Sequence, residues 1–145
     1  MSEPSASRDV IVSQRAPEPV GPYPHARRVG PLLFLSGIGP RQRDRTEIPG
    51  VTLSAKGGVA AYDFEAQCRS TLENIRMIFE DAGSSLEQVV DVTVFLTNIR
   101  DDFAPMNHIY AEYFGRNRPA RTTVEVTCLP TPIAIEMKVV AAIQG

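Results

Sequence analysis

The stretch Arg121-Thr-Thr-Val-Glu-Val-Thr-Cys-Leu-Pro-Thr-Pro-Ile-Ala-Ile-Glu-Met-Lys-Val-Val-Ala141 decides how this chain is expected to fold. Both halves are rich in β-branched and apolar residues, so they predict two β-strands joined by a turn over 129–132 as a hairpin. The first strand begins with Arg121, and the second carries Glu136 at its centre. A carboxylate inside an apolar strand costs free energy unless it is paired, hydrated or part of a site. The search for a function therefore starts from Glu136.

Length and composition indicate one globular domain. The chain has 145 residues and a formal net charge of −2, and we divide it into a flexible tail over 1–8 and one domain over 9–145. Nucleic-acid-binding domains are usually basic, so no nucleic acid partner is expected. No apolar run is long enough to span a membrane, and no signal peptide precedes the domain. Two cysteines without a secretory signal favour a cytoplasmic location.

Hydrophobic periodicity gives the elements in the order β-β-α-β-α-β-β. Asp63 is a candidate N-cap and Gly83 a candidate stop for the first helix. The second helix is expected to start at Asp101 or Asp102 and to end by Gly115. The remaining elements before the last two strands are strands over 9–13, 32–36 and 88–97, a proline-rich segment over 16–25 and a long loop over 41–61. The pattern predicts an α+β domain with two helices on one face of a mixed sheet.

The second face of this sheet is expected to be buried between subunits. On the strand 88–97, Val90, Val92, Val94 and Leu96 lie on one face, and the other face is only half apolar. Glu136 adds a charge among apolar residues of the last strand. Packing this face against further copies of the chain resolves the conflict, so we predict an oligomer with polar residues in clefts between subunits.

Arg121 and Glu136 are the strongest candidates for chemistry. A guanidinium group binds a carboxylate through two hydrogen bonds, which fixes the orientation of a small acid. A carboxylate in a partly dry cleft can hold a water and accept its proton as that water attacks carbon. The alternatives are a surface ion pair for Arg121 and a structural partnership with a basic residue across the sheet for Glu136.

Further candidates are Ser36, Gly37, Tyr23, His25 and Asn107. Ser36 and Gly37 follow a buried strand, where a hydroxyl and backbone amides can bind an anion. Tyr23 and His25 lie in the stiff proline-rich segment, which suits precise placement. Asn107 interrupts the expected apolar stripe of the second helix, formed by Phe103, Tyr110 and Phe114. The alternative for Ser36 and Gly37 is a plain turn at the end of a strand. For Tyr23 and His25 it is an exposed position in a loop, and for Asn107 it is a structural contact that caps the helix or ties down a loop.

A metal or cofactor site is not expected. Two histidines and two cysteines lack ligand spacing, and no glycine-rich phosphate loop lies between a strand and a helix.

Several segments, taken together, resemble the Rid family of imine and enamine deaminases, also called the YjgF family. These segments run in order from 20 to 141: Val20-Gly-Pro-Tyr-Pro-His25, Leu35-Ser-Gly37, 67–74, Asp81-Ala-Gly83, 89–96, 102–110, Pro119-Ala-Arg121, Val124-Glu-Val126, Leu129-Pro130 and Ile135-Glu136. The resemblance implies a chorismate-mutase-like fold. It also implies a homotrimer with active sites in the clefts between subunits, and a trimer and a dimer of trimers both stay open.

The resemblance also assigns residue roles. It implies that Arg121 binds the substrate carboxylate and that Glu136 handles the attacking water. The pocket positions of the family fall on Tyr23, Ser36, Gly37, Phe95 and Asn107. Thr123 occupies a position where many members have cysteine and is expected to offer its backbone N–H.

Departures from the family pattern make the chain similar to the 2-aminomuconate deaminases. His25 replaces an amide residue, and Ile38-Gly-Pro-Arg-Gln-Arg-Asp-Arg45 replaces the usual continuation. This subgroup implies a hydrolase acting on a C–N bond of a small dicarboxylate enamine, without cofactor, in aromatic-compound degradation. Arg121 would hold the near carboxylate, and His25 or an arginine of 41–45 the distal one, unless that loop is merely solvated.

The implied reaction begins with tautomerisation of the enamine to an imine. Water held by Glu136 adds to the imine carbon, and the carbinolamine releases ammonia and 2-oxohex-3-enedioate, while Tyr23 or His25 shuttles protons. Two alternatives stay open, a broad 2-iminopropanoate or 2-iminobutanoate deaminase and a non-catalytic or RNA-directed protein.

Overall fold

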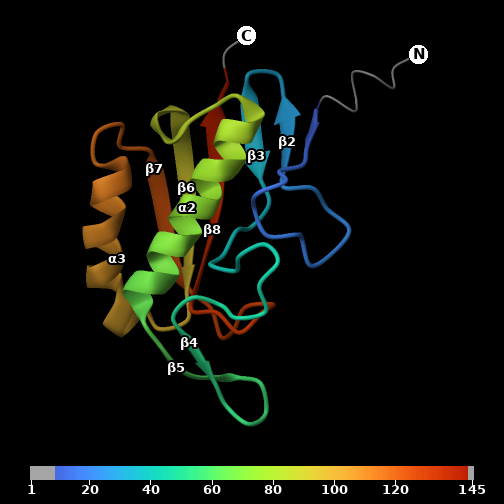
Figure 1. Ribbon diagram of the computed structural model, residues 1–145. Coiled ribbons are helices and arrows are strands. Elements are labelled where there is room, and N and C mark those ends of the chain that lie inside the picture. The colour runs from blue at the N-terminus through green and yellow to red at the C-terminus, as the bar shows by residue number, and fades with distance from the viewer. Residues whose placement is uncertain (1–8, 144–145) are drawn as a thin grey trace.

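The computed structural model describes residues 9–143, so the tail predicted over 1–8 lies outside the described residues. One six-stranded mixed sheet carries two helices on one face, as predicted (Figure 1). The helices are α2 (Phe64–Ala82) and α3 (Ile99–Phe114), with a short 3-10 turn at Leu86–Gln88. The strands are β1 (Val10–Ile11), β2 (Ala26–Val29), β3 (Leu32–Leu35), β4 (Val51–Leu53), β5 (Val59–Tyr62), β6 (Val89–Leu96), β7 (Ala120–Glu125) and β8 (Ile135–Ala142).

The strand order is β1-β2-β3-β8-β6-β7, which corrects the prediction of a C-terminal hairpin. β6 lies between β7 and β8, so those two strands do not pair with each other. β7 runs parallel to β6 because α3 returns the chain to the end of the sheet where β6 began. β8 then enters antiparallel on the other side of β6. The connection over 126–134 is long enough for this passage, and the turn at 129–132 lies within it.

The first helix forms where its boundary residues predict. The side chain of Asp63 accepts a hydrogen bond from the Ala66 N–H, which satisfies one of the free donors of the first turn. Gly83 ends the helix at φ 86°, a left-handed conformation that side chains disfavour. The buried side of α2 packs on the sheet through Cys68, Leu72 and Phe79.

The second helix differs from its prediction at its start and in its buried face. It begins at Ile99 because the side chain of Asn98 accepts from the Asp101 N–H at 3.2 Å and caps the helix. The fully buried positions are Asp102, Met106, Ile109 and Phe114. Phe103 is 40% exposed, so the predicted stripe through Phe103 was partly wrong. α3 covers the edge strand β7, and this part of the helix is turned toward that edge.

The hydrophobic core lies between the helices and the sheet. Val92, Val94 and Leu96 of β6 are fully buried there, as the alternation predicted. Val90 is 45% exposed, contrary to prediction, because the register shifts between Val89 and Asp91. A bulge of this kind displaces the alternation by one residue.

Two strand pairs were missing from the prediction. β2 contains Arg27 and Arg28 and lacks an apolar run, yet it pairs along the whole of β3. The predicted loop over 41–61 contains the small separate hairpin β4–β5, which projects beyond the end of the main sheet (Figure 1). The phenol of Tyr62 ties this hairpin to α3 through a 2.5 Å hydrogen bond to Asp102 Oδ2.

Within residues 9–143, no helix covers the second face of the sheet. Phe34 and Val124 are each 37% exposed, and Phe95 and Glu136 lie in register on adjacent strands of this face. We call it the open face. Neither helix of the described region combines the length and hydrophobicity that crossing a bilayer requires.

Candidate functional site

Arg121 and Glu136 lie on opposite faces of the sheet. Arg121 is in register with Val92, whose side chain is fully buried under the helices. Glu136 is in register with Phe95, which points to the open face because residue orientation alternates along β6. One copy of the chain therefore does not bring the two candidate residues together. Each belongs to its own cluster of side chains.

Aromatic rings of α3 surround Arg121. Its guanidinium carbon lies 4.8 Å from the ring centre of Tyr110 and 5.7 Å from that of Phe103. Its Nη1 also contacts the sulfur of Met106 at 3.8 Å. A guanidinium over ring faces is positioned without losing its charge or its hydrogen-bond donors. The alternative of a surface ion pair is not observed, since no carboxylate of residues 9–143 lies within 4.0 Å of Arg121.

Polar groups without partners lie beside Arg121. The hydroxyls of Thr123 and Tyr110 are buried and make no hydrogen bond within the described part of the chain. Thr123 is in register with Val94 and therefore shares the helix-covered face with Arg121. Asn107 is half-buried on α3, between Phe103 and Tyr110 in sequence. We call the group of Arg121, Thr123 and these α3 residues the arginine half-site.

Glu136 lies in a small pocket at the other side of the sheet. The pocket has a volume of about 100 Å³ and is formed by three loops and the start of β8. Its lining residues are Val20, Tyr23, Gly37, Gly39, Arg41, Pro130, Thr131, Ile133 and Glu136. We call it the glutamate half-site. It collects Tyr23, Gly37 and Glu136, which lie far apart in the sequence.

The Glu136 carboxylate is partly desolvated. Burial raises its pKa above the ordinary value of 4.5, and no other cause contributes. The predicted alternative, a structural ion pair, is absent: no basic group of residues 9–143 lies within 4.0 Å of Glu136. The nearby Lys138 instead donates to the carbonyl of Leu35 at 2.5 Å. A desolvated carboxylate with no partner is suited to accept a proton.

Gly37 gives the carboxylate its place. A Cβ at this position would overlap Oε2 of Glu136 and would lie 2.9 Å from its Cδ. With any larger residue at position 37, the Glu136 carboxylate would have to shift from its position beside the backbone after β3. Gly37 thus lies directly against Glu136 and lines the same pocket, and the absence of a side chain leaves room for the carboxylate.

Tyr23 and Ser36 have different positions. Tyr23 is 41% exposed, and its phenol oxygen accepts a weak 3.3 Å bond from the Val20 N–H, so its own O–H hydrogen can still donate. The Ser36 hydroxyl donates to the carbonyl of Pro24 at 2.7 Å. Ser36 therefore anchors the proline-rich segment against the end of β3.

His25 is 2% exposed, and both of its ring nitrogens have partners. Nδ1 accepts from the Ser13 N–H at 2.9 Å, and Nε2 lies 2.7 Å from the carbonyl of Pro17. This arrangement requires the neutral tautomer with hydrogen on Nε2. The prediction that His25 binds substrate finds no free ring nitrogen here, and the ring connects Ser13, just after β1, to Pro17 of the proline-rich segment. Sequence position alone did not reveal this burial.

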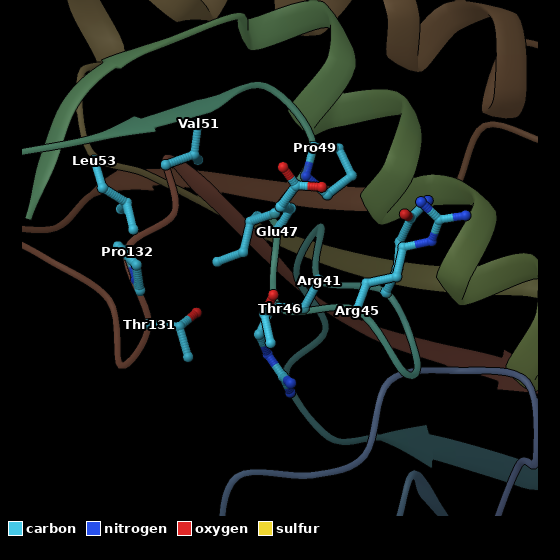
Figure 2. Close-up of a pocket in the computed structure, with 11 residues that line it drawn as sticks. Arg41, Arg45, Thr46, Glu47, Pro49, Val51, Leu53, Thr131 and Pro132 are labelled. Carbon is cyan, nitrogen blue, oxygen red and sulfur yellow. The ribbon is translucent and has the colours of Figure 1, made fainter. Parts of the chain in front are cut away.

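A larger groove of about 790 Å³ lies next to the glutamate half-site. Figure 2 shows Thr131 and Pro132 on one wall of the groove and Arg41, Thr46 and Glu47 on the other. Arg41 and Thr131 line both the groove and the glutamate half-site. Within residues 9–143 no group of three or more histidine, cysteine or acidic side chains is arranged as a metal site.

Sequence reasoning missed the aromatic support of Arg121 and the loop walls around Glu136. Phe103 and Tyr110 were interpreted as core residues, although their spacing of seven places them on one side of α3. Gly39 and Ile133 were not singled out. An added Cβ at Gly39 would lie 2.7 Å from the Ile133 side chain, so the two loops meet closely at the pocket.

The comparison with known families decides the classification. The family model described as Endoribonuclease L-PSP matches residues 13–143. The chain belongs to this family. The resemblance to the Rid family that the sequence indicated is thereby confirmed, and Rid is the name used below.

Relatives of known name cover almost the whole chain. A RutC family protein of Pyrococcus abyssi is 42% identical over 93% of this chain and 97% of its own length. The Escherichia coli protein named as a reactive intermediate deaminase, TdcF, is 32% identical over 92% of this chain and 96% of its own. Its crystal structure with bound serine aligns with a TM-score of 0.79, covering 93% of this chain and 98% of that one. The yeast protein YEO7 aligns with a TM-score of 0.81 at 32% identity, over 93% and 98% of the two chains.

Proposed function

We propose that this Rid protein hydrolyses the C–N bond of an imine or enamine acid, at a site completed by two copies of the chain. The observation that carries the proposal is the pair of half-sites. One presents a cation without a counter-ion, and the other presents a desolvated carboxylate without a partner. A small acid with an electrophilic carbon beside its carboxylate requires both groups, one to hold the acid and one to activate water.

A second copy would bring the halves together. Arg121 lies on β7, the edge strand of the sheet, and Glu136 lies on the side with the open face. The open face presents Phe34, Phe95 and Val124 together with polar groups, a composition suited to packing against further copies. A closed ring of three chains gives three equivalent clefts and leaves no open face unpaired.

In the proposed mechanism, the guanidinium of Arg121 binds the carboxylate beside the imine carbon. Glu136 accepts a proton from water while the water oxygen forms a bond to that carbon. The resulting carbinolamine takes up a proton on nitrogen, and its C–N bond then breaks so that ammonia leaves. The hydroxyl group loses its proton to solvent in the same step and becomes the carbonyl of the 2-oxo acid. Tyr23 can donate the proton to nitrogen because its O–H is not used within the chain. The buried Thr123 hydroxyl and Asn107 complete the polar surroundings of the carboxylate.

The name and bound ligand of a relative support this reaction class. TdcF is named a reactive intermediate deaminase, and its crystal structure holds serine, a small acid with nitrogen beside the carboxylate. For the present chain we propose 2-aminomuconate as the specific substrate, with 2-oxohex-3-enedioate and ammonia as products. The broad deaminase of 2-iminopropanoate and 2-iminobutanoate is the alternative.

The test is ammonia release from freshly generated 2-aminomuconate and from 2-iminopropanoate made by an amino acid oxidase. We expect hydrolysis of both, with a higher kcat/KM for 2-aminomuconate. Glu136→Gln is the matched control, since it keeps the shape and removes the base; kcat should fall by about 10²–10⁴-fold. Equal or faster turnover of the short imine would favour the broad deaminase. Turnover unchanged in Glu136→Gln would contradict the proposed mechanism.

A ribonuclease is the second candidate, because the description of the family model names that activity. The net charge of −2 does not favour long-range attraction of a phosphate backbone. Purified protein should therefore leave labelled single-stranded RNA intact. RNA cleavage that survives in both Glu136→Ala and Arg121→Ala would support this candidate in place of the deaminase.

A further inference from the structure

We infer that Arg41 is a second anion-binding point, which holds the distal carboxylate of an extended dicarboxylate and so determines substrate choice. The inference rests on the proposed function, because it concerns the far end of a substrate whose reacting carbon lies at Glu136. The sequence left three arginines and one histidine as candidates for this role. The structure separates them by their partners and by the cavities that they line.

Arg41 lies at the junction of three cavities. It lines the glutamate half-site with Glu136, the adjoining groove, and a cleft of about 30 Å³ beside Tyr23 and Ser36. It follows Pro40, directly after the extended segment 37–39, in which Gly37 lies close to the Glu136 carboxylate. An acid bound with its reacting carbon at Glu136 can therefore extend toward Arg41 without leaving the pocket.

The guanidinium of Arg41 is positioned but not neutralised. Its Nη2 donates to the carbonyl of Glu18 at 2.7 Å, which uses one of its five N–H donors. The main-chain carbonyl of Arg41 accepts from Asn74 Nδ2 at 2.7 Å, so the backbone is fixed on α2 as well. No carboxylate of residues 9–143 lies within 4.0 Å of Arg41. A half-buried, held guanidinium without a counter-ion is suited to bind an anion.

The other candidates have different roles. Arg43 donates to the carbonyls of Ala16 and Ser13 and pairs with Glu18 at 3.4 Å, so it braces the N-terminal segment. His25 has both ring nitrogens occupied.

Arg45 lines the groove but not the glutamate half-site. The groove also contains Glu47, whose negative charge opposes an anion placed deep within it. The charge distribution therefore favours a carboxylate at the Arg41 end of the groove.

The experiment compares Arg41→Gln, Arg41→Lys and Arg45→Gln with the wild type. For each, kcat/KM is measured on 2-aminomuconate and on 2-iminopropanoate, and the inhibition constants of muconate and of the monoacid sorbate are measured beside them. In Arg41→Gln, kcat/KM for the diacid substrate should fall by roughly 10- to 100-fold, the factor expected for losing a hydrogen bond to a charged group. Its activity on the short imine should stay within about threefold, because that substrate has no distal carboxylate.

Three further results are expected. Arg41→Lys should recover part of the loss, since it restores charge without the planar fork. Arg45→Gln should change kcat/KM for each of the two substrates by less than about threefold. Muconate should inhibit the wild type better than sorbate does, and Arg41→Gln should remove that difference. Melting temperatures of all variants confirm that they remain folded.

Two outcomes would overturn the inference while leaving the proposed function intact. In the first, Arg41→Gln lowers kcat/KM equally for both substrates. In the second, Arg41→Gln leaves kcat/KM for the diacid unchanged, and Arg45→Gln lowers it. Failure of the proposed function has a different signature, because a wild type that releases ammonia from neither substrate contradicts the deaminase itself.

Discussion

The two half-sites surround an isolated charged group with different environments. Arg121 keeps its charge against aromatic rings, at 4.8 and 5.7 Å from two ring centres, beside buried hydroxyls that have no partner. Glu136 lies among loop backbone and apolar groups, and burial there raises its pKa. The first region surrounds a guanidinium group with aromatic rings, while the second disfavours the charged form of a carboxylate. Under the proposed function, this difference suits the arginine half-site to bind the substrate and the glutamate half-site to transfer protons.

Mixing subunits tests whether the two half-sites of one active site come from different chains. Arg121→Ala and Glu136→Gln should each be nearly inactive alone, but their co-expressed 1:1 mixture should regain about a quarter of wild-type activity if each site takes one half from each of two chains. The measurement is ammonia release by the whole co-expressed mixture, purified through a tag that both variants carry.

The control is wild type co-expressed with the Arg121→Ala/Glu136→Gln double variant. Sites shared between chains give about a quarter of wild-type activity, whereas sites within one chain give about half. Absence of any recovery in the first mixture, together with half activity in the second, would place both residues in one chain's site.

A smaller effect is expected from Gly37→Ala. The added Cβ would overlap the Glu136 carboxylate, which must then shift, and a displacement of this kind lowers kcat/KM by roughly 10- to 100-fold. Gly58→Ala is the matched control, because its Cβ would meet only Ser54 Oγ at 3.6 Å, an ordinary contact. If both variants keep wild-type kinetics, the position of Glu136 is not critical.

The aromatic support of Arg121 predicts a weaker effect still. Tyr110→Leu should lower kcat/KM by about 3- to 30-fold, mainly through a higher KM, since a cation–π contact contributes about 0.5–2 kcal/mol. Tyr110→Phe keeps the ring and removes a buried hydroxyl without a partner, so it should retain most activity.

Tyr113→Leu serves as the control on the same helix, because that ring packs on Arg76 rather than on Arg121. A loss in Tyr113→Leu as large as that in Tyr110→Leu would point to general damage to α3.

The smallest effect concerns stability and pH. The folded-state pKa of Glu136 is raised above 4.5, so below 4.5 the group is neutral in both states and wild type and Glu136→Gln should melt alike. As the pH rises through 4.5 toward the folded-state pKa, the unfolded state loses its proton first, and wild type loses stability relative to Glu136→Gln.

Thermal melts of both proteins across acidic to neutral pH should therefore diverge by a few degrees, with the variant more stable at neutral pH. A wild type that is more stable than Glu136→Gln at neutral pH would show that Glu136 is paired and not merely desolvated.

The sequence was a good guide wherever the decisive interactions were local. Asp63 and Gly83 mark the two ends of α2 through contacts with residues three or four positions away, and both ends were predicted. The alternation of β6 correctly placed Val92 and Val94 in the core. Glu136 was proposed as a site residue because a charge in an apolar strand is a local anomaly, and Arg121 was proposed because it begins such a strand; both remain predictions.

Interactions between distant segments were not predictable in the same way. The prediction of a C-terminal hairpin was wrong because the sequence of two successive β-strands does not show that β6 lies between them in the sheet. The burial of His25 was not predicted because its ring partners, Ser13 and Pro17, lie twelve and eight residues away in the chain. The separation of Arg121 from Glu136 onto opposite faces depends on the registers of β7 and β8 against β6, which only the folded sheet defines.

Proline residues in the walls of the glutamate half-site and its neighbouring cleft have a kinetic consequence. Pro17, Pro19 and Pro24 lie in one wall, Pro40 precedes Arg41, and Pro130 and Pro132 lie in the loop before β8. Proline narrows the backbone conformations of an unbound loop, so little further ordering is needed when an acid enters. We therefore expect association to be fast and free of a lid-closing step, so that short-lived imines are captured before they hydrolyse in water.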